Sequence, residues 1–106
     1  MSDSVRASHI LLMYQGSMRS RATRSKEVAA QLIADLKKQL DGGGDFAALA
    51  KANSDCPSSA QGGDLGAFGR SQMVKPFEDA TYALAVGAIS DVVETPFGFH
   101  LIQRTG

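Results

Sequence analysis

The 106-residue sequence has no tryptophan, one cysteine and two histidines, and it lacks a long hydrophobic run. A single cysteine, Cys56, excludes an internal disulfide and any multi-cysteine zinc site, and two histidines are too few for most metal sites. Without about 18 consecutive apolar residues, we expect no membrane span. The N-terminus has no basic region followed by an apolar one, so a secretory signal is not expected. These absences favour a cytoplasmic or nuclear protein.

Net charge is also absent, because eleven basic residues balance eleven acidic ones. This balance argues against a general binder of nucleic acid. The basic segment Arg19–Lys26 could still contact DNA or RNA, but it lacks the interleaved aromatic residues of such surfaces. With 43% hydrophobic residues, the chain can bury one modest core. We expect a flexible segment over residues 1–4 and one domain over 5–106, with no feature that favours an oligomer over a monomer.

The pattern of apolar and turn residues predicts an α+β fold in which helices partly wrap a small sheet. The expected elements are a strand (Val5–Met13), a loop (Tyr14–Arg24), a helix capped by Ser25 and ended by Gly42–Gly44, a short helix (Asp45–Ala52), an irregular loop (Ser54–Phe68), a helix from Pro76 to Gly87, and two strands (Ile89–Glu94, Phe99–Arg104). In the first helix, apolar residues recur every four positions, which predicts a buried stripe of Val28, Leu32, Leu36 and Leu40, with Ala29 and Ile33 beside it.

Four segments carry a resemblance to a known family. They are SHILL (Ser8–Leu12), SDCPSSAQGGDLGAFGRSQMVKPFEDA (Ser54–Ala80), VGAIS (Val86–Ser90) and TPFGFHLIQRTG (Thr95–Gly106). On these segments the chain resembles the parvulin family of peptidyl-prolyl cis/trans isomerases, and its arginine-bearing insert after the first strand is similar to that of the Pin-type subgroup. The resemblance implies a four-stranded antiparallel sheet surrounded by about four helices, with a short fourth strand near Gly66–Phe68. No WW or FHA targeting module is present in the sequence.

The implied reaction rotates an Xaa-Pro amide in a protein substrate, against a barrier of about 18–20 kcal/mol. It breaks no bond, and it needs no metal or cofactor. A catalyst must bind the twisted amide more tightly than either planar form, and an apolar slot for the prolyl ring serves this end. The resemblance assigns the slot to Leu65, Met73 and Phe77. Composition alone favours ordinary core residues for these three side chains, and it is the resemblance that favours the slot.

The resemblance assigns the polar part of the catalytic site to His9, Cys56, Thr95 and His100. A free cysteine is often a small buried hydrophobe. We interpret Cys56 as a polar wall beside the rotating carbonyl rather than as a nucleophile. Family members place the two histidines side by side, and we expect this pair to be mainly structural, with Thr95 bonded to His100. Phe97 replaces a hydroxyl residue that many Pin-type members carry.

Arginines of the insert indicate a binding site for a phosphate or a carboxylate, since a guanidinium can form two parallel hydrogen bonds with either group. By resemblance, Arg19 and Arg21 would bind a phosphorylated or acidic residue before proline. The match is incomplete, because Met13 and Met18 stand where the family usually has a lysine and an arginine. The other interpretation is a solvated charged loop.

A binding module or chaperone that holds proline-containing segments without turnover would use the same pocket. The combined presence of the apolar slot and the inner polar residues favours turnover, because binding alone would not require the polar group.

Overall fold

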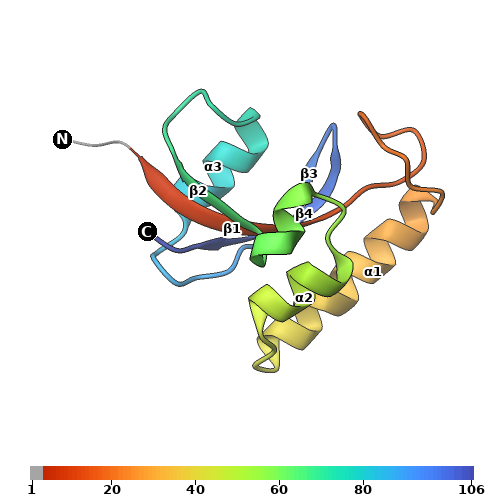
Figure 1. Cartoon of the computed structure of the whole chain (residues 1–106), viewed down its shortest axis with the longest axis horizontal. Coiled ribbons are helices and arrows are strands. Elements are labelled where there is room, and N and C mark those ends of the chain that lie inside the picture. Colours follow the sequence, from red (N-terminus) through yellow and green to blue (C-terminus); the bar gives the residue numbers. More distant parts are fainter. Residues whose placement is uncertain (1–3) are drawn as a thin grey trace.

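A computed structural model of the chain describes residues 4–106 (Figure 1). In chain order the elements are β1 (Val5–Leu12), α1 (Lys26–Asp41), α2 (Phe46–Asn53), the 3-10 helix η1 (Pro57–Gln61), β2 (Asp64–Phe68), α3 (Lys75–Ala83), β3 (Val93–Thr95) and β4 (Gly98–Arg104). The strands form one antiparallel sheet in the order β2-β1-β4-β3, which confirms the expected α+β class and the antiparallel four-stranded sheet. Residues 1–3 of the expected flexible segment lie outside the described residues.

The helices cover both faces of the sheet, with α1 and α2 together on one face and α3 on the other (Figure 1). Side chains alternate between the two faces along each strand. On β1, Ile10 and Leu12 pack into the core beneath α1 and α2, whereas Val5 and Ala7 join Phe77 of α3 in a second core. The sequence run Ile10–Leu12 is continuously apolar because β1 is a central strand covered on both faces.

The buried face of α1 differs from the predicted stripe. Ser25 caps the helix as expected, accepting a hydrogen bond from the Val28 backbone N–H. However, Val28 and Leu32 are 48% and 40% exposed, so the prediction that they are buried was wrong. The buried residues of the helix are Ala29, Ile33, Leu36 and Leu40. A spacing of four residues drifts around a helix of 3.6 residues per turn, whereas steps of three and four stay on one face.

Three other expectations needed correction. The segment Ser54–Phe68 is more regular than predicted, since it holds η1 and β2. The expected strand Ile89–Glu94 shrinks to β3, with one isolated bridge between Ile89 and Gln103. Helix α3 ends at Ala83 rather than near Gly87. Strand β2 and the segment after α3 are shaped by tertiary hydrogen bonds to β1 and β4, which periodicity does not report. The predicted short strand near Gly66–Phe68 is present as part of β2.

Candidate active site

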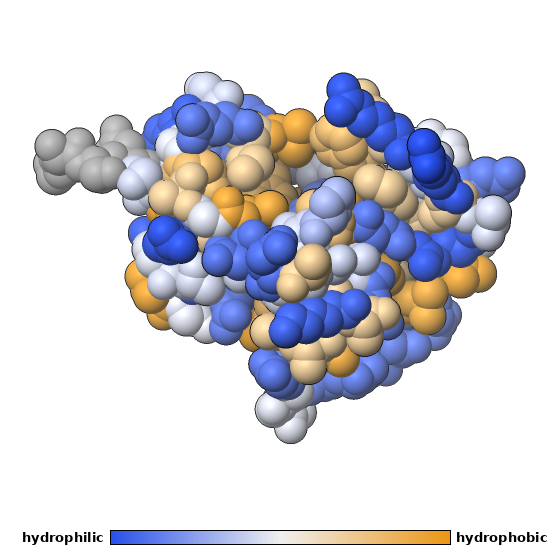
Figure 2. All heavy atoms as spheres, in the orientation of Figure 1, coloured by the Kyte–Doolittle hydropathy of each residue, from blue (hydrophilic) through white to orange (hydrophobic). Residues whose placement is uncertain are grey.

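An apolar cavity of about 450 Å³ lies on the α3 side of the sheet. Strands β1 and β4, helix α3, the start of η1 and the β3–β4 turn all contribute to it. Its lining residues are His9, Leu11, Met13, Cys56, Pro57, Leu65, Gln72, Met73, Val74, Phe77, Phe97 and His100. Figure 2 shows hydrophobic surface along the notch between the α3 side of the molecule and the loop that follows β1. The cavity therefore combines an apolar lining with a few polar groups, as small-ligand sites commonly do.

Strand register brings the two histidines to the floor of this cavity. Leu11 of β1 pairs with His100 of β4, and His9 pairs with Ile102, so the two imidazoles lie diagonally on the same face. Their Nδ1 atoms are 3.1 Å apart, and the rings stack with centroids 5.3 Å apart. Residues 91 positions apart in sequence thus become neighbours because β1 and β4 are adjacent central strands.

A hydrogen-bonded chain runs behind the histidine pair. The Phe97 backbone N–H donates to the Thr95 hydroxyl, and this hydroxyl lies 2.7 Å from Nε2 of His100. Thr95 is buried behind His100, and the cavity lining formed by the described residues does not include it. If the hydroxyl donates to Nε2, the ring hydrogen of His100 is on Nδ1, where it can be donated to Nδ1 of His9. One hydrogen bond between two Nδ1 atoms requires that only one of them carries a hydrogen.

Burial keeps both imidazoles neutral. Loss of hydration lowers the pKa of His9 from 6.5 to about 4. The pKa of His100 falls to about 3, first because of burial and second because of repulsion from a charged His9. At neutral pH the pair is therefore an uncharged, dry base to the cavity rather than a cationic one.

Phe77 forms the back of the cavity and contacts both histidines. Its ring meets His9 and His100 edge to face, at angles of 81° and 77° and centroid distances of 5.5 and 5.3 Å. Leu65 and Met73 are half-buried and pack against the same apolar cluster. The three residues of the predicted proline slot therefore converge around one space, from β2, the segment before α3, and α3 itself.

Two hydrogen bonds fix the segment between β2 and α3, one to a side chain of α3 and one to a side chain of the segment itself. The backbone N–H of Ser71, whose φ is +70°, donates to the buried carboxylate of Glu78 on α3. Gln72 accepts a hydrogen bond from the Gly69 backbone N–H at 2.5 Å. These bonds hold the loop that presents Gln72 and Met73 to the cavity, so the slot is preformed.

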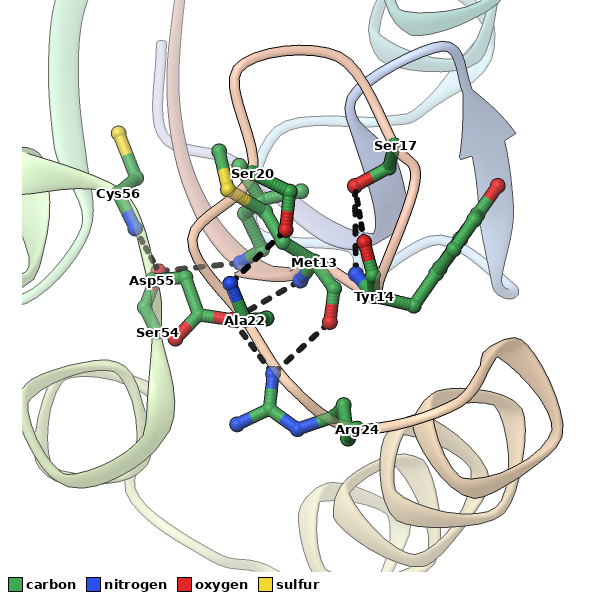
Figure 3. Close-up of polar contacts among 10 residues, drawn as sticks. Met13, Tyr14, Ser17, Ser20, Ala22, Arg24, Ser54, Asp55 and Cys56 are labelled. Atoms are coloured by element: carbon green, nitrogen blue, oxygen red, sulfur yellow. Dashed lines mark hydrogen bonds and ion pairs between the residues drawn. The ribbon is translucent and has the colours of Figure 1, made fainter.

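Cys56 is held at the rim by the segment that runs beside the end of β1. The Asp55 backbone N–H donates to the Leu11 carbonyl, and the Ser54 hydroxyl accepts hydrogen bonds from the N–H groups of Leu11 and Cys56 (Figure 3). Pro57 then opens η1 and turns the chain away. Cys56 is half-buried and lines the cavity.

A second hollow, of about 680 Å³, adjoins the apolar cavity and is lined mainly by the loop after β1. Its lining residues are Met13, Arg19, Arg21, Ala22, Thr23, Arg24, Asp55 and Pro57. Met13 and Pro57 line both spaces, so the basic hollow and the apolar cavity are contiguous. Figure 2 shows strongly hydrophilic side chains over this loop, next to the hydrophobic notch.

The loop is anchored at both ends and in its middle. The Gln15 N–H donates to the Arg24 carbonyl and closes the base of the loop, and the Met18 N–H donates to the Pro96 carbonyl of the β3–β4 turn. Arg19 adopts a left-handed backbone conformation, with φ of 59°, which non-glycine residues seldom adopt. The loop thus presents Arg19 and Arg21 in a defined arrangement above the hollow.

The structure brings six sequence-predicted residues to one cavity: His9, Cys56, Leu65, Met73, Phe77 and His100. Thr95 lies directly behind them, and Arg19 and Arg21 line the adjoining hollow. Met13 and Phe97, noted in the sequence as departures from the family pattern, are walls of the cavity. Sequence reasoning missed Leu11, Pro57, Gln72 and Val74, although Leu11 shares the strand face of His9 and could have been found by alternation.

Comparison with known proteins places this geometry in context. A family model described as "PPIC-type PPIASE domain" matches residues 1–106. Peptidyl-prolyl cis-trans isomerase Pin1 of Arabidopsis thaliana is 46% identical over 114 residues, which cover 97% of this chain and 96% of that protein. The Pin1 protein of Digitalis lanata is 47% identical over 116 residues, covering 99% and 98%. The structure of the peptidyl-prolyl isomerase ESS1 from Candida albicans is similar, with a TM-score of 0.92 and 37% identity over 98% of this chain and 63% of that one.

Proposed function

The chain belongs to the PPIC-type family and is a peptidyl-prolyl cis/trans isomerase, and from this premise we propose that it prefers Xaa-Pro bonds in which an acidic or phosphorylated residue precedes the proline. The observation that carries the proposal is the contiguity of an apolar cavity and a basic hollow, which share Met13 and Pro57. A prolyl ring in the first space would place the side chain of the preceding residue near the second.

In this proposal the prolyl ring occupies the slot formed by Leu65, Met73 and Phe77. Burial of an apolar group of this size is favourable by roughly 1.5–3 kcal/mol, enough to hold the ring while the preceding carbonyl rotates. Since the ring is equally apolar in all states of the amide, this contact provides anchoring. Selective stabilisation of the twisted state must come from the surroundings of the carbonyl.

The carbonyl would rotate over the neutral histidines and past Cys56. A planar amide owes its stiffness to conjugation, which separates charge between oxygen and nitrogen. A poorly hydrated site disfavours that charge separation and so lowers the cost of the twisted form. The lowered pKa values of His9 and His100 support such a dry site, because the same loss of hydration causes them. The mechanism is non-covalent, with Cys56 as a polar wall.

In the basic hollow, Arg19 and Arg21 would bind the carboxylate or phosphate of the residue before proline. Both side chains are exposed at the rim and free of the ion pairs that occupy Arg24 and Lys26 among the described residues. Their guanidinium groups can each donate two hydrogen bonds to an anion.

Exchange NMR on three peptides that differ only in the residue before proline tests the proposal. We expect faster exchange for Glu-Pro and phosphoSer-Pro than for Ala-Pro. Arg19→Ala combined with Arg21→Ala should reduce the two acidic substrates to the Ala-Pro rate. Phe77→Ala should slow all three, provided that circular dichroism shows a folded protein, since loss of a buried phenyl ring costs about 3–5 kcal/mol.

Equal wild-type rates for the three peptides would remove the acidic preference. No acceleration of any peptide, with binding retained, would instead favour the alternative of a proline-segment binding module.

A further inference from the structure

An ion pair between Arg24 and Asp55 lies inside the basic hollow (Figure 3). Arg24 Nη1 is 2.6 Å from Asp55 Oδ2, and both side chains are less than one-third exposed. The pair also encloses the end of β1, because Arg24 donates to the Met13 carbonyl and Asp55 accepts from the Met13 N–H, each at 2.9 Å. Arg24 is therefore occupied before any ligand arrives.

This pair changes the charge that the hollow offers to a ligand. Three arginines and one aspartate line it, so its charge is three minus one, or +2. Without Asp55, Arg24 would be a third free cation beside Arg19 and Arg21. Without Arg24, the Asp55 carboxylate would face the ligand unpaired. Charges of this kind act over several ångströms, and the partial burial of Arg24 and Asp55 reduces the screening of their charges by water.

We propose that Asp55, acting through Arg24, is a specificity-determining residue that limits how strongly the enzyme prefers an anionic residue before proline. This inference rests on the acidic preference proposed above, and it identifies the residue that sets the strength of that preference. Asp55 competes with the substrate anion for Arg24.

A purely structural role for the pair would have a different signature. The bonds to Met13 place the shared wall of the two spaces, so a loss of positioning would slow every peptide alike, including Ala-Pro. An electrostatic role would change only the ratio between charged and uncharged peptides. The two roles are separable because Asn and Gln keep hydrogen-bonding capacity while removing charge.

Four proteins form the test: wild type, Asp55→Asn, Arg24→Gln and the double variant. Each is assayed by exchange NMR on Ala-Pro, Glu-Pro and phosphoSer-Pro peptides at low salt. Asp55→Asn raises the net charge of the hollow to +3. It should increase the ratio of the Glu-Pro rate to the Ala-Pro rate by about threefold to tenfold. Arg24→Gln lowers the net charge of the hollow to +1 and should decrease the same ratio by a similar factor. The double variant restores +2 and should return the ratio to within about twofold of wild type. The phosphoSer-Pro ratio should move in the same directions by a larger factor.

Two patterns would overturn the inference. One is a parallel loss for all three peptides in both single variants, with no recovery in the double variant. The other is a set of unchanged ratios in folded variants.

Failure of the proposed role of Asp55 can be distinguished from failure of the acidic preference itself. That preference fails if wild type treats the three peptides alike and the Arg19 and Arg21 variants change nothing. The role of Asp55 is judged separately, by whether Asp55→Asn raises the ratio above that of wild type, whatever the wild-type value is.

Discussion

His9 and His100 are ionisable groups buried in a site that has no anion to stabilise their charged forms among the described residues. Burial lowers both pKa values below the ordinary 6.5, to about 4 and about 3. The unfolded chain therefore binds more protons than the folded chain over this pH range. The contribution of the two neutral histidines to the free energy of unfolding is fully present above about pH 6.5. This contribution is lost as the pH falls from 6.5 towards 4.

We expect the free energy of unfolding to fall between pH 7 and pH 5 by about 2 kcal/mol for each histidine. Urea denaturation at a series of pH values measures this directly. A double variant, His9→Asn with His100→Asn, is the control, because it removes both titrating groups and should flatten the dependence. An equally steep dependence in the double variant would assign the effect to other groups.

Cys56 lines the cavity as a polar wall in the proposed mechanism. Cys56→Ser keeps a small polar side chain at the same place, so we expect a rate on an Ala-Pro peptide within about tenfold of wild type. Removal of a covalent nucleophile would cost far more, on the order of a thousandfold or above. Exchange NMR decides between the two, and a loss of that larger size would contradict the non-covalent mechanism.

At the scale of elements, close contact between β1 and the start of β2 depends on a glycine. Gly63 has φ of +87°, and its carbonyl accepts the His9 N–H at 2.9 Å. A Cβ added there would overlap the carbonyl oxygen of His9. Gly66 in β2 has a similar φ of +73°, but a Cβ there would meet nothing within 4 Å. Substitutions at the two glycines therefore distinguish the cost of a left-handed backbone conformation, which both share, from the cost of steric overlap, which only Gly63 has.

We expect Gly66→Ala to cost about 1–2 kcal/mol of stability from the left-handed backbone alone. Gly63→Ala should cost at least about 2 kcal/mol more, because the strand must also shift away from His9. Chemical denaturation of both variants measures the difference, and catalysis should fall with Gly63→Ala in proportion to displacement of the histidine. Equal losses of stability would show that the strands can separate there without cost.

Helix α1 shows what periodicity can and cannot specify. Its position, its Ser25 cap and its amphipathic character followed from the sequence. Its orientation did not, because Val28 and Leu32 are as apolar as the residues that are buried. Only the position of the sheet decides which side of such a helix faces the core. The shortened strand β3 has a related explanation, since only Val93–Thr95 pairs with β4 in a continuous ladder, whereas Ile89 makes one isolated bridge to Gln103.

At the scale of the whole molecule, the chain has no net charge, yet three of its six arginines line one hollow. Local charge rather than total charge should therefore govern substrate choice. Screening lengths fall from about 10 Å at 0.1 M salt to about 3 Å at 1 M. We expect the ratio of Glu-Pro to Ala-Pro rates to fall towards one as salt rises from about 0.05 M to about 0.5 M. The Ala-Pro rate is the internal control and should change little; a constant ratio would contradict an electrostatic preference.

Within the part of the chain that the structure describes, no helix is long and apolar enough to cross a membrane. The two cores lie on opposite faces of the sheet, and the active-site cavity lies at the end of the one beneath α3. Helices α1 and α2 therefore back the sheet from the other face, and the cavity lies beside α3 on the face that α3 covers only in part.

The sequence by itself determined the α+β class, most element positions and, through its motifs, the family and the identity of nine candidate residues. The roles assigned to these residues remain predictions. The resemblance also led us to expect that His9 and His100 lie side by side and that Thr95 is bonded to His100. Only the tertiary structure supplied the register and distances of that arrangement, and only the tertiary structure decided that Met13 and Pro57 join the apolar cavity to the basic hollow. It also decided that Arg24 is already paired with Asp55. The physical reason is that local sequence fixes backbone preference and the alternation of side chains. Contacts between residues 31 positions apart, as for Arg24 and Asp55, or 91 apart, as for His9 and His100, depend instead on strand order, register and loop closure, which no local pattern encodes.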